Sequence, residues 1–309
     1  MRRTAPIVVA LLALQAVLVL LFVAPARDPQ PHRLPVGVVG PAPAPRGDAF
    51  DVHRYPDADA ARAAIREREV YGAVVPAEGR VLVASAAGPV VAQQLGQQLG
   101  GAAGANGVHV EDVVPIASGD PRGAALNLLF LPLMIACFPL AALLGRMRLP
   151  SRRSLGIVVS FSTLSGLALT ALLRAMDALP GPYVAVAGVA ALVVAAVALT
   201  ATGLFRVLGP AGLGIAAVLF VVLGNPGSGN ATAPELLPGF WRVAGQLLPP
   251  GAGGQALRDV AYFDGHALLA PALVLAAWAI LGAALILTRA RTPSPTPAPA
   301  PEPRIAVPA

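Results

Sequence analysis

The chain has no lysine and only one cysteine, and charged residues make up just 12% of its 309 residues. Soluble domains carry about 25% charged residues, so this share, with 56% hydrophobic residues, excludes an ordinary soluble protein. The single cysteine, Cys137, excludes an internal disulfide framework and a cysteine-cluster metal site. A Walker A nucleotide loop needs a lysine and is therefore excluded as well. No G-x-S-x-G or HExxH motif is present, so we expect neither an enzyme nor a cofactor.

What the chain does contain is long apolar segments. Segments of about 17–25 apolar residues with few charges are typical of transmembrane helices. Six such segments predict a polytopic α-helical membrane protein: 7–24, 124–144, 155–173, 183–204, 208–223 and 267–288. The first has two interpretations, because residues 1–26 form either an uncleaved transmembrane anchor or a signal peptide cleaved after a small-x-small site at Ala24-Pro25-Ala26.

The distribution of arginine predicts the orientation. With the N-terminus inside, the inside segments hold ten arginines and one acid, whereas the outside segments hold twelve arginines and fifteen acids. Cytoplasmic loops carry the positive excess, so we expect a bacterial plasma-membrane protein with cytoplasmic termini and extracytoplasmic residues 27–123. The net charge of +6 is then a topology signal, and no nucleic acid is expected as a partner. The densest basic loop, 145–154, contains Arg146, Arg148, Arg152 and Arg153.

Residues 27–123 alternate strand-like and helix-like patterns, which predicts a small extracytoplasmic α/β domain between the first two spans. The expected strands are 36–39, 50–55, 70–75, 80–84 and 108–114, and the expected helices are 58–69 and 88–99. The run Arg66-Glu67-Arg68-Glu69 is interpreted as an exposed helix end with charge pairs. The histidines are not in metal-ligand spacing, so the domain is expected to be a binding or spacer module.

The membrane domain, 124–288, has no ionisable residue inside its spans. Ion-coupled transporters need such groups, so secondary transport is disfavoured. The span 155–173 is rich in hydroxyls, among them Ser160, Ser162 and Thr163. These side chains either support helix packing or line a translocation path. Beyond the last span, residues 289–309 are Pro-rich and are expected to form a disordered cytoplasmic tail.

The loop 224–266 is too polar to span a membrane and too apolar for a plain loop. Two short amphipathic helices fit residues 234–263, with a break at Pro249-Pro250-Gly251. We expect them to be re-entrant or to lie at the outer interface, anchored at headgroup depth by aromatic residues. The residues that we assign to this interface are Trp241, Arg242, Arg258, Tyr262 and Phe263.

This layout resembles that of the ABC-2-type export permeases, and the chain is similar in particular to YhgE/Pip-like membrane proteins. The resemblance rests on VGVVG at 36–40, VYGAVVP at 70–76 and NPGSG followed by ELLPGFWRVAGQLLPPGAGGQALRDVAYFDG before the last span. It implies a membrane subunit that forms a homodimer or heterodimer, often working with a separate ATPase.

Two functions follow as expectations. The first is the permease subunit of an ABC-2-type exporter that moves a hydrophobic or amphipathic substrate, with loop 145–154 contacting the ATPase. The alternative is a non-transporting envelope protein, such as a secretion accessory, scaffold or surface receptor, that acts through its extracytoplasmic domain. Both place the chain in a lipid bilayer.

Overall fold

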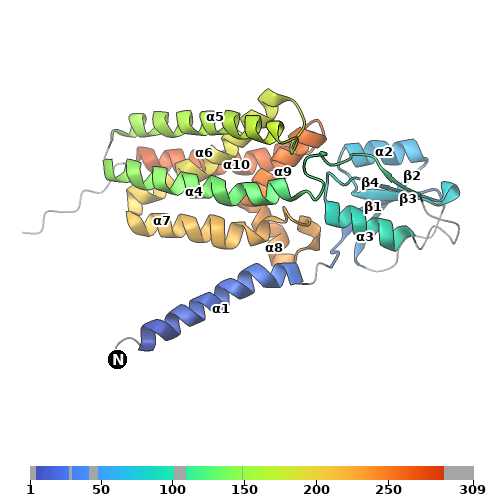
Figure 1. Ribbon diagram of the computed structural model, residues 1–309, viewed down its shortest axis with the longest axis horizontal. Coiled ribbons are helices and arrows are strands. Elements are labelled where there is room, and N and C mark those ends of the chain that lie inside the picture. The colour runs from blue at the N-terminus through green and yellow to red at the C-terminus, as the bar shows by residue number, and fades with distance from the viewer. Residues whose placement is uncertain (1–4, 28–29, 42–47, 101–108, 148, 289–309) are drawn as a thin grey trace, which may run out of the picture.

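The computed structural model describes residues 5–27, 30–41, 48–100, 109–147 and 149–288. A helical bundle forms most of the molecule, and a small sheet domain lies at one end of it (Figure 1). Within the described residues, four helices are long and apolar enough to cross a membrane: α4 (Ala124–Met147), α5 (Ser151–Ala175), α6 (Tyr183–Leu208) and α10 (Leu269–Leu287). They coincide with four of the expected spans and indicate a multi-pass membrane protein.

The other two expected spans are helical but are not established as membrane crossings. Helix α7 (Pro210–Ala217) continues into the π-helical segment η3 (Val218–Gly224), and together they form a shorter apolar helix. Helix α1 (Ala5–Arg27) is apolar and 23 residues long. That these two segments also cross the membrane, which would make six spans, therefore stays a prediction.

Helix α6 is the centre of the bundle and contacts α4, α5, α7, α9 and α10. Its approach to α10 is close because both helices present glycine at the crossing. A Cβ added to Gly282 would lie 2.3 Å from the backbone nitrogen of Thr200. The hydroxyl of Thr200 donates a hydrogen bond to the carbonyl of Trp278 at 2.9 Å. Small residues and hydroxyls at such a crossing are typical of helix packing in membranes.

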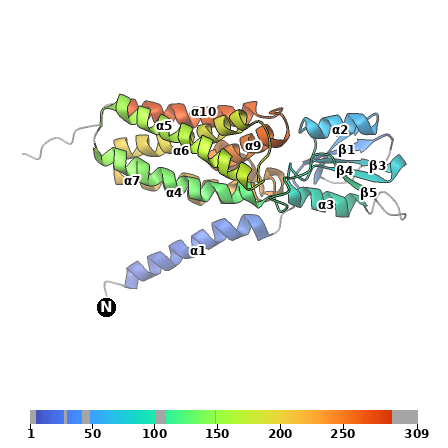
Figure 2. The same ribbon diagram turned by 45° about the horizontal axis from the view of Figure 1, so that its top comes forward.

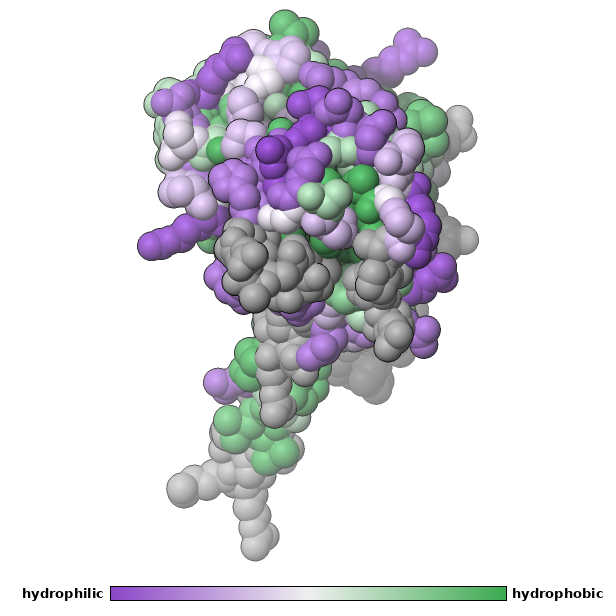
Figure 3. All heavy atoms as spheres, turned by 90° about the vertical axis from the view of Figure 1, so that its right-hand side faces the viewer, coloured by the Kyte–Doolittle hydropathy of each residue, from purple (hydrophilic) through white to green (hydrophobic). Residues whose placement is uncertain are grey.

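Helix α1 stands clear of this bundle in both ribbon views (Figure 1, Figure 2). Its contacts are with η3 and with η4 (Pro226–Ser228). Seen from the sheet-domain end, α1 projects below the body of the molecule and carries apolar side chains (Figure 3). Between positions 17 and 23 exposed apolar side chains cover most of the helix surface, namely Val17, Val19, Leu20, Phe22 and Val23, and the half-buried Leu18 and Leu21 lie on the remaining side.

The sheet domain has five strands in the order β2-β1-β3-β4-β5. The strands are β1 (Leu34–Val39), β2 (Phe50–Tyr55), β3 (Gly72–Val75), β4 (Arg80–Val83) and β5 (His109–Asp112). Neighbours are parallel except β3 and β4, which are antiparallel and joined by the 3₁₀ turn η1 (Pro76–Glu78). Helix α2 (Ala58–Arg66) lies on one side of the sheet and α3 (Pro89–Gly100) on the other (Figure 1). The expected α/β region is thus confirmed.

The core of this domain is not built from residues 27–123 alone. Ala233, Leu236 and Phe263 belong to the same buried cluster as the strands and helices of the sheet domain. All three lie between the bundle helices in sequence, and each is at most 2% exposed. The sheet domain and the membrane bundle therefore share a packed boundary.

Candidate functional site

The boundary is formed by residues 226–262, which contain four short helical turns and one longer helix. These are η4, η5 (Pro234–Leu236), α8 (Gly239–Ala244), η6 (Gly245–Leu247) and α9 (Pro249–Tyr262). The helical segment expected to stop at Pro249-Pro250-Gly251 does stop just before it, at Leu247, but these three residues begin α9 instead of separating it from the preceding segment. Proline is favoured in the first turn of a helix, where its missing N–H has no partner to lose. Helix α9 contacts α4, α6 and α10, and most of its side chains are buried.

A buried ion pair joins the two parts of the molecule. Arg68 of the sheet domain donates through Nη1 to the Asp259 carboxylate of α9, and their side chains are 10% and 1% exposed. Through Nη2 the same guanidinium donates to Gln255 at 2.9 Å, and it lies 5.2 Å from the centre of the Phe263 ring. The expectation of an exposed helix end at 66–69 is therefore wrong for Arg68: α2 ends at Arg66, and Arg68 has a positive φ of 61°.

A second polar contact crosses the boundary beside this pair. The hydroxyl of Tyr71, directly before β3, donates to the Glu235 carboxylate at 2.7 Å. Burial, together with the negative charge of Glu235, raises the pKa of the Tyr71 hydroxyl above its ordinary value. The hydroxyl therefore remains protonated and remains a donor. The backbone N–H of His32 also donates to the Glu235 carbonyl at 2.9 Å.

Arg258 is a second buried guanidinium at the boundary, beside Arg68. Its side chain is 2% exposed and donates through Nη2 to the Asn230 carbonyl at 3.2 Å. Nη1 is buried and has no hydrogen-bond partner among the described residues. Burial, and then repulsion by Arg68, lower the pKa of Arg258 to about 10. A buried cation with an unused donor is costly unless a negative charge lies near, and Asp259 supplies that charge.

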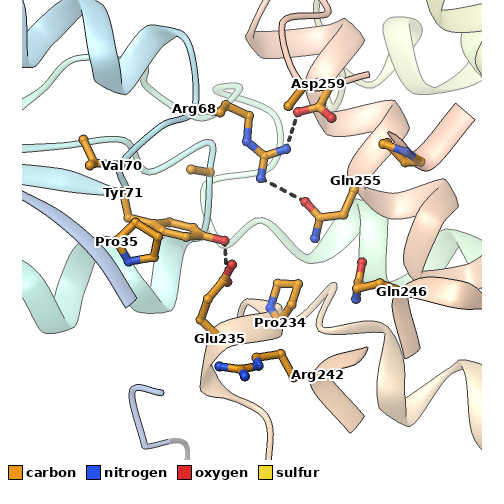
Figure 4. A pocket seen from close by; sticks show the side chains of 13 residues that line it. Pro35, Arg68, Val70, Tyr71, Pro234, Glu235, Arg242, Gln246, Gln255 and Asp259 are labelled. Carbon is orange, nitrogen blue, oxygen red and sulfur yellow. Dashed lines mark hydrogen bonds and ion pairs between the residues drawn. The ribbon is translucent and has the colours of Figure 1, made fainter. Parts of the chain in front are cut away.

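A cavity of about 330 Å³ opens at this boundary (Figure 4). Its polar lining carries both signs of charge, with the basic residues Arg68 and Arg242 and the acidic residues Glu235 and Asp259. Tyr71, Gln246 and Gln255 add uncharged polar groups, and prolines, alanines and a valine complete the wall. Such a lining suits a ligand with polar and apolar parts.

Three of the four basic residues expected at an ATPase do not line this cavity. Arg146 at the end of α4, and Arg152 and Arg153 at the start of α5, are exposed. They lie at the end of the bundle opposite the sheet domain (Figure 1). Arg148 falls outside the described residues. The structure thus brings three of the four arginines together on one exposed turn.

The three hydroxyls expected along a translocation path do not share a face. Ser162 is buried, and its hydroxyl donates to the Val158 carbonyl of its own helix at 2.8 Å. Ser160 and Thr163 are exposed, and Thr163 donates to the Val159 carbonyl at 3.0 Å. Hydroxyls bonded back to their own helix are already satisfied. The nearest cavity, about 270 Å³ between α4 and α5, is apolar apart from Ser165.

The residues expected at the outer interface divide into two groups. Headgroup-depth anchoring is wrong for Phe263, which is 2% exposed inside the sheet-domain core. Arg258 is also 2% exposed, so its side chain faces protein, and the position of its helix at the outer interface stays a prediction. Tyr262 is half-buried, and its hydroxyl accepts from the backbone N–H of Ala117 at 3.4 Å. Trp241 is half-buried beside exposed Phe240, and Arg242 donates to the His32 carbonyl at 3.0 Å. Arg242 and Tyr262 thus bond to segments on either side of the sheet domain, whereas Trp241 packs against Phe240 and Gly227.

Sequence reasoning missed the four residues that cross the boundary in pairs: Arg68, Tyr71, Glu235 and Asp259. One signal was available, because Arg258-Asp259 stands in an otherwise apolar helix, and buried charges need partners. The identity of those partners could not be read from spacing. Among the described residues, no group of three His, Cys, Asp or Glu side chains could hold a metal ion.

Comparison with known proteins adds no further assignment to this geometry. No protein-family model, no curated protein and no solved structure matches the chain.

Proposed function

We propose that the chain is the membrane subunit of an ABC-2-type exporter. It moves a hydrophobic or amphipathic substrate across a bacterial plasma membrane, and a separate ATPase supplies the energy. The termini are cytoplasmic, the sheet domain is extracytoplasmic, and two subunits form the transporter.

The observation that carries this proposal is the packed connection from the sheet domain to the bundle. Arg68 binds Asp259 on α9, and α9 packs against α4, α6 and α10. Helix α4 ends, and α5 begins, at the exposed arginines of the opposite end. A movement imposed on that turn would pass along α4 to α9 and then to the sheet domain. An exporter needs such a connection, because energy enters at one face and the substrate leaves at the other.

The experiment is a mild-detergent purification of the tagged full chain with mass spectrometry of the proteins that accompany it. We expect a stoichiometric ATP-binding subunit, lost in the double variant Arg152→Glu/Arg153→Glu. The matched control is Arg66→Glu/Arg122→Glu, which reverses two exposed charges at the sheet-domain end. Loss of the ATPase in both variants, or in neither, contradicts contact through this turn.

Orientation needs its own test. In a Cys137→Ala background, single cysteines are placed by Ser118→Cys beside the sheet domain or by Ser151→Cys at the arginine turn. We expect a membrane-impermeant thiol reagent to label the first in intact cells and the second only after permeabilisation. The reverse pattern would contradict the proposed topology.

One observation favours the alternative, a non-transporting envelope protein that acts through the sheet domain. Ser160 and Thr163 face away from the bundle, and Ser162 is bonded to its own helix, so these hydroxyls form no continuous polar path. Copurification of envelope or secretion proteins without any ATPase would support this function and contradict export.

A further inference from the structure

The cavity between the sheet domain and the bundle, which we call the boundary cavity, has the size of a small ligand site. Its volume of about 330 Å³ is near the lower end of the range of about 300–1,000 Å³ for ligand pockets. One wall comes from the sheet domain and the other from residues 234–271 (Figure 4). Ala267 and Pro271 lie at the start of α10, one of the four helices that are able to cross a membrane. The end of such a helix lies near the depth of lipid headgroups, and so does this part of the cavity.

The charges that line the boundary cavity are balanced but only partly paired. The two cations are Arg68 and Arg242, and the two anions are Glu235 and Asp259. Arg68 and Asp259 pair with each other, whereas Arg242 and Glu235 form no ion pair with one another although both line the same cavity. Opposite charges that share a cavity without meeting favour a ligand that brings a complementary charge to each of them.

The polar atoms that remain at these two residues are accessible. Glu235 accepts a hydrogen bond from Tyr71 through Oε2, which leaves Oε1 without a partner among the described residues. Arg242 donates through Nη1 to the His32 carbonyl, which leaves Nη2 and Nε. None of these three atoms is among the side-chain atoms buried without a partner, and neither is Oε1 of Gln246. Because all three residues line the cavity, a ligand there can reach two acceptor oxygens and one guanidinium.

This lining favours a zwitterion that carries a primary ammonium. A guanidinium matches the geometry of a phosphate, and a carboxylate accepts hydrogen bonds from an ammonium that carries N–H groups. A quaternary ammonium has no N–H and is recognised by aromatic cages, but Tyr71 is the only aromatic side chain among the described residues of the lining. A ligand with a single sign of charge would leave either Glu235 or Arg242 without a partner.

Exposed apolar side chains flank the lining residues Arg242, Gln246 and Pro271 in the chain. They are Phe240, Val243 and Leu247 on α8 and η6, and Leu269 and Leu273 on α10. The two segments are joined, because the indole N–H of Trp278 on α10 donates to the Leu247 carbonyl at 2.8 Å. Acyl chains can lie on this surface while a headgroup enters the cavity.

We propose that the boundary cavity binds the zwitterionic headgroup of a lipid, with its primary ammonium at Glu235 and its phosphate at Arg242. The balanced charges of the lining are retained when such a headgroup binds, and the apolar surface beside it accounts for a lipid instead of a soluble zwitterion. Binding here requires neither export nor an ATPase.

The test uses purified full-length protein and native mass spectrometry to count retained lipids. The probes are phosphatidylethanolamine, phosphatidylcholine and phosphatidylglycerol with the same acyl chains, and we expect the first to be retained at the lowest concentration. Glu235→Gln should weaken its retention about ten-fold, the effect of one hydrogen bond to a charged group, and should abolish its advantage over phosphatidylcholine. Arg242→Gln should weaken retention of both lipids by a similar factor and leave that advantage in place, because both carry the phosphate.

The matched controls are Glu67→Gln and Arg122→Gln, which remove exposed charges outside the cavity lining and should leave retention unchanged. Thermal unfolding identifies a variant that fails to fold, and the preference among lipids in the parent chain tests the proposal without any substitution. Equal retention of the three lipids, or an undiminished preference for phosphatidylethanolamine in Glu235→Gln, would overturn the proposal. Displacement by soluble glycerophosphoethanolamine at similar concentration would show a site for soluble zwitterions and would also overturn it. Copurification of an ATPase is measured separately, so failure of lipid binding and failure of export are distinct results.

Discussion

The ion pair between Arg68 and Asp259 should dominate the stability of the boundary between the sheet domain and the bundle. Asp259→Asn removes the carboxylate, which leaves the buried guanidinium of Arg68 without its ion-pair partner and takes away a negative charge that favours the charged form of buried Arg258. Removing one partner of a buried pair costs about 3–5 kcal/mol. Opening of the boundary should therefore become about two to four orders of magnitude more frequent.

Hydrogen exchange of β3 backbone amides, measured on the full chain in nanodiscs, reports this opening. The matched control is Asp51→Asn, which breaks the exposed Arg33–Asp51 pair, whose side chains are 73% and 45% exposed. Exposed pairs contribute about 0–1 kcal/mol, so exchange should hardly change in the control.

A double variant separates the cost of an unpaired charge from the value of the pair. Arg68→Met with Asp259→Leu replaces both partners by apolar side chains, and such replacements are often neutral or stabilising. Because buried Arg258 still loses the negative charge of Asp259, we expect the double variant to open more often than the parent chain but less often than Asp259→Asn. The reasoning would be refuted if Asp259→Asn changed the opening free energy by less than about 1 kcal/mol, or if the double variant opened as readily as the single one.

Two further predictions concern the bundle and the sheet. Gly203→Ala should lower the thermal stability of the full chain by about 1–3 kcal/mol, because the new Cβ would lie 2.7 Å from the Gly282 carbonyl oxygen. Gly188→Ala in the same helix meets nothing within 4 Å and should be neutral or stabilising, so equal effects would refute close packing of α6 on α10. In the sheet domain, hydrogen bonds from Arg62 lower the pKa of the Glu111 carboxyl below its ordinary 4.5. A carboxyl whose pKa is lower in the folded state than in the unfolded state stabilises the fold at pH values above its unfolded-state pKa. That stability is lost as the pH falls through the folded-state pKa. Protection of β5 amides should therefore decline below about pH 4.5, with a shallower decline in Arg62→Met; an identical decline in both would contradict this pairing.

The elements themselves could be predicted from sequence because their signals are local. The expected strand at 50–55 is β2, residue for residue, and the expected span at 183–204 lies within α6. Proline was the exception: Pro249-Pro250 breaks a helix interior but also suits a helix start, and the local sequence fits both.

The boundary site could not be predicted because its partners are far apart in the chain. Arg68 and Asp259 are separated by 191 residues, and no periodicity indicates which distant charges meet. The alternating charges around Arg68 also resemble a solvated helix end. Because α2 ends at Arg66, Arg68 lies outside the helix and its guanidinium reaches α9. Charge in an apolar helix predicts that a partner exists, not which residue it is.

The shared core of the sheet domain has a consequence for how the chain is made. Ribosomes add about 5–20 residues per second, so roughly 10–40 s separate the synthesis of Arg68 from that of Asp259, 191 residues later. During that interval the strands can pair, but Leu236 and Phe263 are not yet present to cover them. Nascent chains therefore pass through a stage with an open apolar face, and messages truncated after α6 should yield protein that is degraded rather than a free-standing receptor domain.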